Sequence, residues 1–243
     1  MSPFSKYTTI IFDIGDVLFT WSSETKTSIS SRTLRRILST PTWFDFERGL
    51  LSQEVCYERV GAEFSLDPAE IGKAFDQARD SLQCNDDLVS LIRELKCQSG
   101  GQLRVYAMSN ISSPDYDYLR TKPADWSIFD RIFTSCAAGE RKPNLGFYRQ
   151  VITQADVDPL RTIFVDDKAD NVTSARSLGF NGIVFDRPEN VMRSLRNLIG
   201  DPVSRGREFL HHNAGMHDSI TDNGTTLKEN FSQLLILEMT NDR

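Results

Sequence analysis

This chain alternates between short runs of β-branched or aromatic residues and stretches with helical periodicity. The runs cover residues 8–12, 103–108, 131–134, 162–165 and 182–185. Such alternation is typical of parallel strands joined by crossover helices. After the fourth run, Asp170 or Asn171 can cap a helix that ends near Gly179, which gives one strand–helix–strand unit. The sequence therefore predicts an α/β protein whose parallel sheet has helices on both faces.

The long interval between the first two runs has helical patterning. Its expected helices cover residues 30–39, 52–64, 68–79 and 86–96. We interpret residues 20–81 as a helical insert that lies over the sheet. Four aromatic residues of this insert could line a ligand cavity, although packing between the helices is the simpler interpretation. They are Trp21, Trp43, Phe44 and Phe46.

Composition excludes several classes of partner. The chain has 243 residues, 39 % of them hydrophobic, and a net charge of -6. An acidic chain without a run of lysines and arginines is a poor partner for nucleic acid or for an anionic membrane. No apolar run approaches the roughly 20 residues of a membrane span, no secretory signal is evident, and the four cysteines lie far apart. We therefore expect a cytoplasmic protein with reduced thiols and a small ligand.

The composition changes beyond Gly200. Residues up to about 226 are rich in Gly, His, Asn, Asp and Thr, and the following leucines indicate a final amphipathic helix. This helix offers a surface for a homodimer or for partner docking. The histidines His211, His212 and His217 lie here without further ligands at suitable spacing, which argues against a zinc site. We expect a core from residues 1–19 and 82–203, a cap from residues 20–81, and an extension from residues 204–243.

Polar residues follow three of the predicted strands. Asp13 follows the first, Ser109 and Asn110 end the second, and Asp166 and Asp167 follow the fourth. Ligands of open α/β sheets gather at the carboxyl ends of the strands, so these side chains are expected to share one crevice. Three carboxylates there would repel one another unless a cation is present or their pKa values rise. A hard, oxygen-seeking ion such as Mg²⁺ fits this set.

Lys142 lies in a segment with loop character. Pro143 favours an extended backbone before it, and Asn144 can begin the next helix. A lysine on such a loop can reach into the crevice, offset carboxylate charge and hold a phosphoryl oxygen. The spacing alone is equally compatible with a solvated surface lysine.

Together these segments resemble the four motifs of the haloacid dehalogenase superfamily, in the same order and at similar spacing. The matching residues are Asp13-x-Gly15-Asp16-Val17, Ser109-Asn110, Lys142-Pro143 and Asp166-Asp167 with Asn171. The resemblance covers about residues 7–200. It implies a Rossmann-like core with a small helical cap inserted after the first strand.

The resemblance also implies an Mg²⁺-dependent phosphatase site. Asp13 would attack phosphorus and form an aspartyl-phosphate. Asp13, Asp167, Asp166 and the backbone carbonyl of Gly15 would hold the Mg²⁺, which neutralises charge on the transferring group.

Four other residues complete the implied site. Ser109 and Asn110 would donate hydrogen bonds to the phosphoryl oxygens. Lys142 would bridge nucleophile and phosphate, and Asn171 would orient the metal ligands. The implied substrate is a small phosphorylated metabolite, either an organic phosphate or a diphosphate.

The sequence departs from this pattern at Gly15, where most phosphatases of the superfamily have a second aspartate. That aspartate protonates the leaving group, and its carbonyl binds the metal. Gly15 keeps the carbonyl and lacks the carboxylate, so acid–base help of typically ~10²–10⁴-fold is missing. Asp16 could substitute, but its side chain leaves a tight loop in a different direction. A diphosphate, an acyl phosphate or a sugar 1-phosphate has a leaving group that needs this help least.

Other functions compete with this prediction. True haloacid dehalogenases also lack the second aspartate, but they act without metal and generally lack the acidic pair that this chain keeps at Asp166 and Asp167. A catalytically weak or accessory domain is another alternative. Residues 139–151, Asp125-Trp126 and the tail resemble fungal dehalogenase-like proteins of drimane-type terpenoid pathways, some of which act on terpenyl phosphates.

Some of those fungal proteins carry a cyclase domain with an Asp-x-Asp-Thr-Thr motif. The tail of this chain has only Asp222-Asn223-Gly224-Thr225-Thr226, with Gly224 in place of the proton-donating aspartate. Cyclase activity is therefore not favoured.

Overall fold

The computed structural model describes residues 6–199 of the chain. Five parallel strands form one sheet in the order β5–β4–β1–β6–β7. They are β1 (Thr9–Phe12), β4 (Arg104–Ser109), β5 (Arg131–Thr134), β6 (Thr162–Asp166) and β7 (Asn181–Val184). Because β1 lies between β4 and β6, the strand order reverses there and leaves a crevice at the carboxyl end of β1. The predicted α/β fold class is confirmed.

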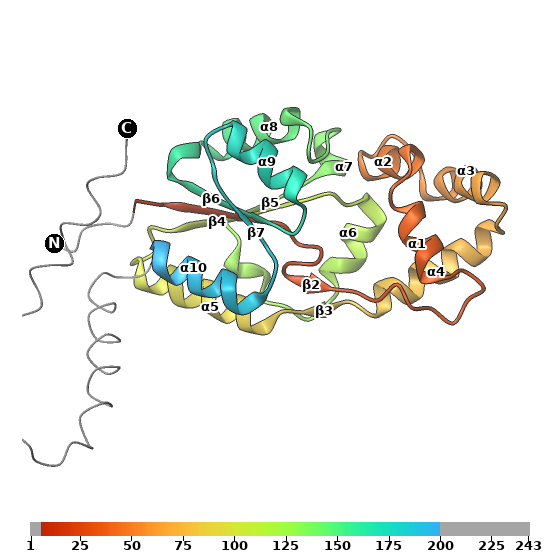
Figure 1. The fold of residues 1–243 in the computed structure, drawn as a ribbon, viewed down its shortest axis with the longest axis horizontal. Helices are drawn as coiled ribbons and strands as arrows, with labels where there is room; N and C mark the ends of the chain where they lie inside the picture. Colours follow the sequence, from red (N-terminus) through yellow and green to blue (C-terminus); the bar gives the residue numbers. More distant parts are fainter. Residues whose placement is uncertain (1–5, 200–243) are drawn as a thin grey trace, which may run out of the picture. The chain divides into compact units, whose positions relative to one another are not determined.

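Helices cover both faces of this sheet (Figure 1). The helices α8 (Leu145–Ala155) and α9 (Ala169–Ser177) lie on one face, and α5 (Asp86–Gln98) and α10 (Pro188–Ile199) lie on the other. Side chains of β1 alternate between the two hydrophobic clusters, with Ile10 and Phe12 on the α5 and α10 side and Ile11 on the opposite side. All three side chains are fully buried, so close packing fixes the position of the central strand and of the residues that follow it.

Four helices form a cap with a hydrophobic cluster of its own. They are α1 (Ser31–Ile37), α2 (Pro41–Glu47), α3 (Gln53–Phe64) and α4 (Pro68–Asp80). Their cluster includes a stacked pair of rings, Trp43 and Phe75, whose centroids are 4.3 Å apart. Figure 1 shows the cap helices beyond the end of β1 that leads toward β2. The side chains of Thr40, Ser52 and Asp67 accept hydrogen bonds at the starts of α2, α3 and α4.

A two-stranded antiparallel ribbon lies where the chain enters and leaves the cap. It pairs β2 (Phe19–Thr20) with β3 (Gln83–Cys84), and the predicted limits of the insert, residues 20 and 81, lie beside it. Strands of two residues are too short for a periodic pattern, so the sequence did not predict this ribbon. The remaining elements are α6 (Ser113–Arg120), the 3₁₀ turn η1 (Trp126–Ile128), α7 (Ser135–Ala138) and the 3₁₀ turn η2 (Pro159–Arg161).

One local prediction is wrong. The helix after β6 begins at Ala169 with Lys168 as its N-cap, because Asn171 lies inside the first turn and turns its side chain toward Asp166. The helix expected over residues 30–39 is present as α1, whereas α2, which Thr40 caps, was not predicted.

Several predictions lie outside the described residues. These are the final amphipathic helix, the three histidines and the Asp222–Thr226 segment. Within residues 6–199, no helix combines the length and the apolar composition needed to cross a membrane. The cysteines Cys56, Cys84, Cys97 and Cys136 are free.

Candidate active site

Asp13 is fixed at the carboxyl end of the central strand. Its backbone N–H donates a 2.8 Å hydrogen bond to the carbonyl of Val165, which extends the pairing of β1 with β6. Its Oδ1 atom accepts a 2.7 Å hydrogen bond from the N–H of Ile14. The side chain is largely buried, so both its position and its orientation are constrained.

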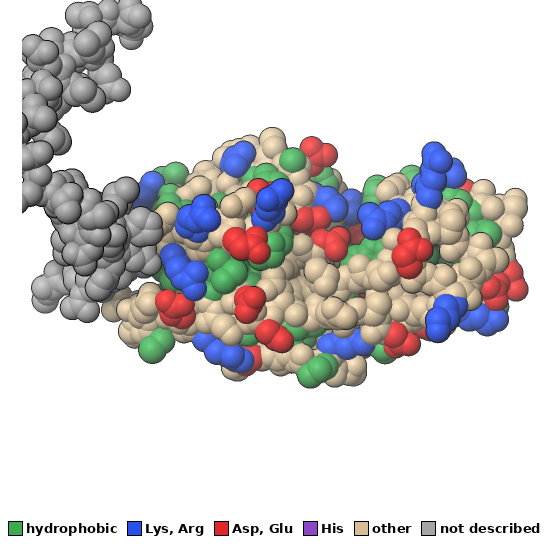
Figure 2. Space-filling view, turned by 60° about the horizontal axis from the view of Figure 1, so that its bottom comes forward, with side chains coloured by type: hydrophobic (Ala, Val, Ile, Leu, Met, Phe, Trp, Pro, Cys, Tyr) green, Lys and Arg blue, Asp and Glu red, His purple; other side chains and the backbone are tan. Residues whose placement is uncertain are grey.

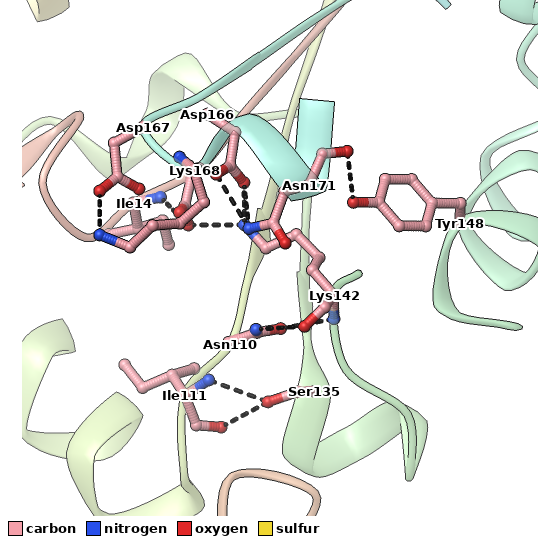
Figure 3. Close-up of polar contacts among 11 residues, drawn as sticks. Ile14, Asn110, Ile111, Ser135, Lys142, Tyr148, Asp166, Asp167, Lys168 and Asn171 are labelled. Carbon is pink, nitrogen blue, oxygen red and sulfur yellow. Dashed lines mark hydrogen bonds and ion pairs between the residues drawn. The ribbon is translucent and has the colours of Figure 1, made fainter. Parts of the chain in front are cut away.

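Lys142 reaches into the crevice and is fully buried. Its Nζ atom lies 2.9 Å from Oδ1 of Asp13 and 2.6 Å from Oδ2 of Asp166, so one ammonium group bridges two carboxylates. The loop that carries this lysine is held by Asn110, whose side-chain amide donates to the carbonyl of Lys142 at 2.9 Å and accepts from its N–H at 2.8 Å (Figure 3). Lys142 is therefore not a solvated surface lysine. The side chain of Asn110 is occupied by hydrogen bonds to the backbone of Lys142.

Asp166 and Asp167 have different surroundings. Asp166 is fully buried and accepts hydrogen bonds from Nζ of Lys142 and from the backbone N–H of Lys168 at 2.8 Å. Nδ2 of Asn171 donates to both of its carboxylate oxygens, at 2.9 and 3.1 Å. Asn171 is itself held by Tyr148, whose hydroxyl donates to its carbonyl at 2.8 Å (Figure 3). A carboxylate has about four lone-pair positions, so those of Asp166 are largely used inside the protein.

Asp167 has a more open carboxylate. Its side chain accepts a 2.5 Å hydrogen bond from Nζ of Lys168, a side chain that is two-thirds exposed. One carboxylate oxygen from each of Asp13, Asp166 and Asp167 lies within 4.8 Å of the others. Three hard oxygen donors at this spacing fit a divalent cation such as Mg²⁺.

The electrostatics of the cluster also favour a cation. Burial raises the pKa of Asp13 to about 7, although Lys142 opposes this rise. Burial by itself lowers the pKa of Lys142, but the attraction of Asp13 and Asp166 outweighs it and raises that pKa. The ammonium therefore stays charged, and an additional positive charge would favour the ionised form of Asp13.

Gly15 and Asp16 form the tight loop that follows Asp13. Gly15 lines the cavity, and a Cβ atom placed on it would meet no atom within 4 Å. Asp16 has a left-handed backbone with φ of 56°, its N–H donates to the carbonyl of Phe19 at 2.8 Å, and its side chain is exposed. Partial burial and the nearby Asp167 raise the pKa of Asp16, while Lys168 and Arg35 lower it.

A cavity of about 800 Å³ extends from these carboxylates to the cap. Its walls include Ser109 at the end of β4, aromatic side chains and arginines. The aromatic residues are Phe19, Trp21, Trp43, Phe44 and Phe75, and the arginines are Arg35, Arg79 and Arg141. Figure 2 shows acidic and basic side chains next to one another around the hollow between the cap and the core, with hydrophobic side chains inside it. Three of the four aromatic residues considered from sequence line the cavity, whereas Phe46 packs inside the cap.

The first comparison concerns a protein that aligns over nearly its whole length. The chain is 40 % identical over 190 residues to the sesquiterpene phosphatase astK of Aspergillus oryzae, which covers 78 % of this chain and 95 % of that protein. The chain belongs to the HAD-like hydrolases.

Other comparisons extend this assignment. The HAD-like chain is 41 % identical over 233 residues to the drimenol cyclase drtB of Aspergillus calidoustus, which covers 96 % of this chain but only 44 % of the cyclase. Residues 203–243 match the family described as the sesquiterpene cyclase astC-like C-terminal domain. A HAD family enzyme of Bacteroides thetaiotaomicron, solved with magnesium and inorganic phosphate, has the same fold with a TM-score of 0.59 and 17 % identity; the match covers 76 % of this chain and 98 % of that one.

Polar contacts join the cap of this HAD-like hydrolase to its core. Nε of Arg141 lies 2.8 Å from Oε2 of Glu47 on α2, and its guanidinium lies 3.8 Å from the ring centre of Phe44. On the other side, Nη1 of Arg79 on α4 lies 2.6 Å from Oδ1 of Asp115 on α6. The cap is thus tied to the loop that carries Lys142 and to the helix that follows Asn110.

The sequence did not predict these contacts between the cap and the core. Arg141 and Glu47 are 94 positions apart, and Arg79 and Asp115 are 36 apart. Contacts at such separations leave no local pattern, whereas the strand ends that carry Asp13, Ser109 and Asp166 are marked by apolar runs. The one nearby signal was the position of Arg141 directly before Lys142.

Proposed function

We propose that this HAD-like hydrolase is an Mg²⁺-dependent phosphatase that acts through Asp13 on an organic phosphate or diphosphate with an apolar body, such as a sesquiterpenyl ester. The observation that carries this proposal is the meeting of Asp13, Lys142 and Asp167 at one end of a cavity whose other walls are aromatic. Similarity to a sesquiterpene phosphatase supports it.

Asp13 is the proposed nucleophile. Its carboxylate oxygen attacks phosphorus, the bond from phosphorus to the ester oxygen breaks, and that oxygen leaves with the electron pair. The result is an aspartyl-phosphate on Asp13. Lys142 lies within 2.9 Å of the same carboxylate, so it can hold Asp13 and offset the charge of a phosphoryl oxygen beside it. Ser109 lies at the cavity wall, where its hydroxyl can donate to a second phosphoryl oxygen.

The metal ligands proposed are Asp13, Asp167 and the carbonyl of Gly15. Bound Mg²⁺ supplies charge neutralisation on the transferring group, and magnesium in the structure of the Bacteroides enzyme supports this choice of ion. Asp166 has most of its lone-pair positions occupied by Lys142, Asn171 and Lys168, so we assign it mainly to positioning. Asn110 and Asn171 position the lysine loop and Asp166.

A water molecule must then attack the aspartyl-phosphate. Its oxygen bonds to phosphorus, the bond to Asp13 breaks, and the protons of the water pass to the released phosphate and to solvent. The missing carboxylate at Gly15 means that neither step has the usual acid–base partner at that position. This favours esters whose leaving group departs without a proton.

Phosphate release from p-nitrophenyl phosphate, acetyl phosphate and the farnesyl monophosphate and diphosphate esters tests this proposal. We expect release that needs Mg²⁺ and that Asp13→Asn lowers by at least about 10³-fold, because the nucleophile is removed. The exposed Asp117→Asn on α6 is the matched control and should retain full activity. Release that continues in Asp13→Asn, or no release from any of these esters, would contradict the proposal.

A second candidate is an accessory domain of terpenoid biosynthesis that binds a phosphorylated terpenoid without turnover. The match to 44 % of a drimenol cyclase and the match of residues 203–243 to a cyclase C-terminal domain favour it. Thermal stabilisation by farnesyl monophosphate without phosphate release would support this candidate. Sustained turnover by the purified chain would exclude it.

A further inference from the structure

Arg35 stands out among the arginines of the active-site cavity. Arg79 and Arg141 both form ion pairs across the boundary between cap and core. Arg35, on α1, lines the same cavity but has no carboxylate within ion-pair distance among residues 6–199. Its Nε atom donates a 3.1 Å hydrogen bond to the hydroxyl of Ser23, and this contact orients the guanidinium. Its charge is therefore available to a ligand.

Arg35 borders two hollows of the structure. It lines the cavity of about 800 Å³ and also a shallower hollow of about 510 Å³ that contains Arg32 and Arg36. An anion bound in the active-site cavity therefore has on its wall a guanidinium that no carboxylate neutralises through an ion pair among residues 6–199.

The space beside Gly15 gives this cation a chemical role. Apart from Gly15 and its two chain neighbours, no atom lies within 4 Å of the Cβ position at Gly15, so there is room beside the proposed nucleophile and Gly15 supplies no acid there. An alkoxide leaving group needs a proton at this point. A phosphate leaving group does not, because a phosphate monoester has its second pKa near 6 and leaves as a stable anion. What such a leaving group needs is compensation of its charge.

We infer that Arg35 binds the inner phosphate of an organic diphosphate while the terminal phosphate lies against Asp13. This assignment rests on the proposed phosphatase function. Asp13 forms a bond to the terminal phosphorus, the bond from that phosphorus to the bridging oxygen breaks, and the bridging oxygen keeps the electron pair. The products are the aspartyl-phosphate and an organic monophosphate whose added charge Arg35 stabilises. A guanidinium suits this task because its planar fork can contact two phosphate oxygens at once.

Arg35 is on this basis a specificity residue for diphosphates. A monophosphate bound at Asp13 places no second phosphate near Arg35, so its hydrolysis does not depend on that side chain. Arg36 provides a matched control, since it lies on the same helix and lines the outer hollow but not the active-site cavity.

The test compares wild type, Arg35→Gln and Arg36→Gln with Mg²⁺ present. For Arg35→Gln we expect kcat/KM for phosphate release from farnesyl diphosphate to fall about 10-fold or more, as for the loss of a charge-assisted contact. The value for p-nitrophenyl phosphate should stay within about 2-fold. Arg36→Gln should behave as wild type with both esters. An equal loss with both esters, or no loss with the diphosphate, overturns the inference.

A binding measurement separates this inference from the proposed function. Calorimetry with farnesyl methylenediphosphonate, a diphosphate analogue that is not hydrolysed, should show about 10-fold weaker binding to Arg35→Gln. Arg35→Lys should lie between the two, because it keeps the charge and loses the fork. Unchanged affinity in Arg35→Gln overturns the role of Arg35. Absence of phosphate release from every ester contradicts the phosphatase proposal but leaves this measurement decisive for Arg35.

Discussion

Gly15 leaves the space beside Asp13 open, and this single position shapes the chemistry that the site can perform. Asp13, which we propose as the nucleophile, lies beside the buried Lys142 and close to the carboxylate of Asp167. Gly15 offers no proton donor. The next residue, Asp16, has a left-handed backbone and an exposed side chain. The site is therefore arranged for charge compensation rather than for proton transfer.

Restoring the carboxylate at Gly15 should broaden the range of substrates. Gly15 has open space at its Cβ position and no left-handed backbone, so Gly15→Asp should fit without strain. We expect hydrolysis of simple alkyl monophosphates to rise by about 10²-fold, because the new acid can protonate the alkoxide. Steady-state kinetics with an alkyl monophosphate measures this. Gly15→Asn has the same shape without the acid, and an equal gain in that variant would contradict the explanation.

Asp167 and Asp166 should respond differently to magnesium. Mg²⁺ at 100 times its dissociation constant stabilises a protein by about 2.7 kcal/mol, which is visible as a rise in the melting temperature. Asp167→Asn should abolish that rise, because its carboxylate faces the cavity. Asp166→Asn should instead lower the melting temperature even without magnesium, because it disturbs buried contacts with Lys142 and Asn171. A magnesium response preserved in Asp167→Asn would remove this residue from the ligand set.

Polar contacts join the helices of the cap to the core, in addition to the packing within the cap. Arg141 joins the lysine loop to α2 through Glu47 and Phe44. Ser135, which is fully buried, donates to the carbonyl of Glu47 at 2.6 Å and accepts from the N–H of Ile111 at 2.9 Å. The end of α2 is thus fixed against the segment that follows Asn110. These ties hold the aromatic wall of the cavity at a set distance from Asp13.

Removal of Arg141 should make stability depend on pH. Burial raises the pKa of Glu47 and Arg141 counteracts it, so Arg141→Met should raise that pKa further above its unfolded value. A carboxyl with a raised folded pKa loses stability as the pH rises through that value. We expect Arg141→Met to lower the free energy of unfolding by about 1–3 kcal/mol at pH 8 and by less at pH 5. Urea titrations at both pH values measure this.

The double variant Glu47→Gln with Arg141→Met is the control for this prediction. It has no carboxyl at position 47, so the difference between pH 8 and pH 5 that Arg141→Met introduces should disappear. If that difference persists in the double variant, another group is responsible.

Local patterns predicted the elements better than the contacts between them. Apolar runs located the strands of the sheet to within one or two residues, because a buried parallel strand leaves a continuous apolar signal. They also located Asp13, Ser109 and Asp166 at the strand ends. The β2–β3 ribbon, the separate α2 and the arginines of the cavity were not predicted. These depend on two-residue pairings or on side chains that meet only after the cap has folded over the sheet.

In the molecule as a whole, all residues of the proposed site lie within residues 6–199. The related sesquiterpene phosphatase aligns over 95 % of its own length, whereas this chain spans 44 % of the related drimenol cyclase. The match to a cyclase C-terminal domain begins only at residue 203. Hydrolysis and any function of residues 203–243 can therefore be separated by experiment.

Deletion of residues 203–243 should leave the hydrolytic reaction intact. The last helix of the described region, α10, ends at Ile199 and packs through Val191 and Leu195 in the cluster on the α5 side of the sheet, so the deletion removes no described core residue. We expect the shortened protein to keep kcat/KM for farnesyl diphosphate within about 2-fold and the same dependence on Asp13 and Mg²⁺. Phosphate release by the two proteins at equal concentration measures this. A shortened protein that remains folded by circular dichroism but loses turnover would show that residues 203–243 contribute to the site, and would favour a function closer to that of the cyclase relatives.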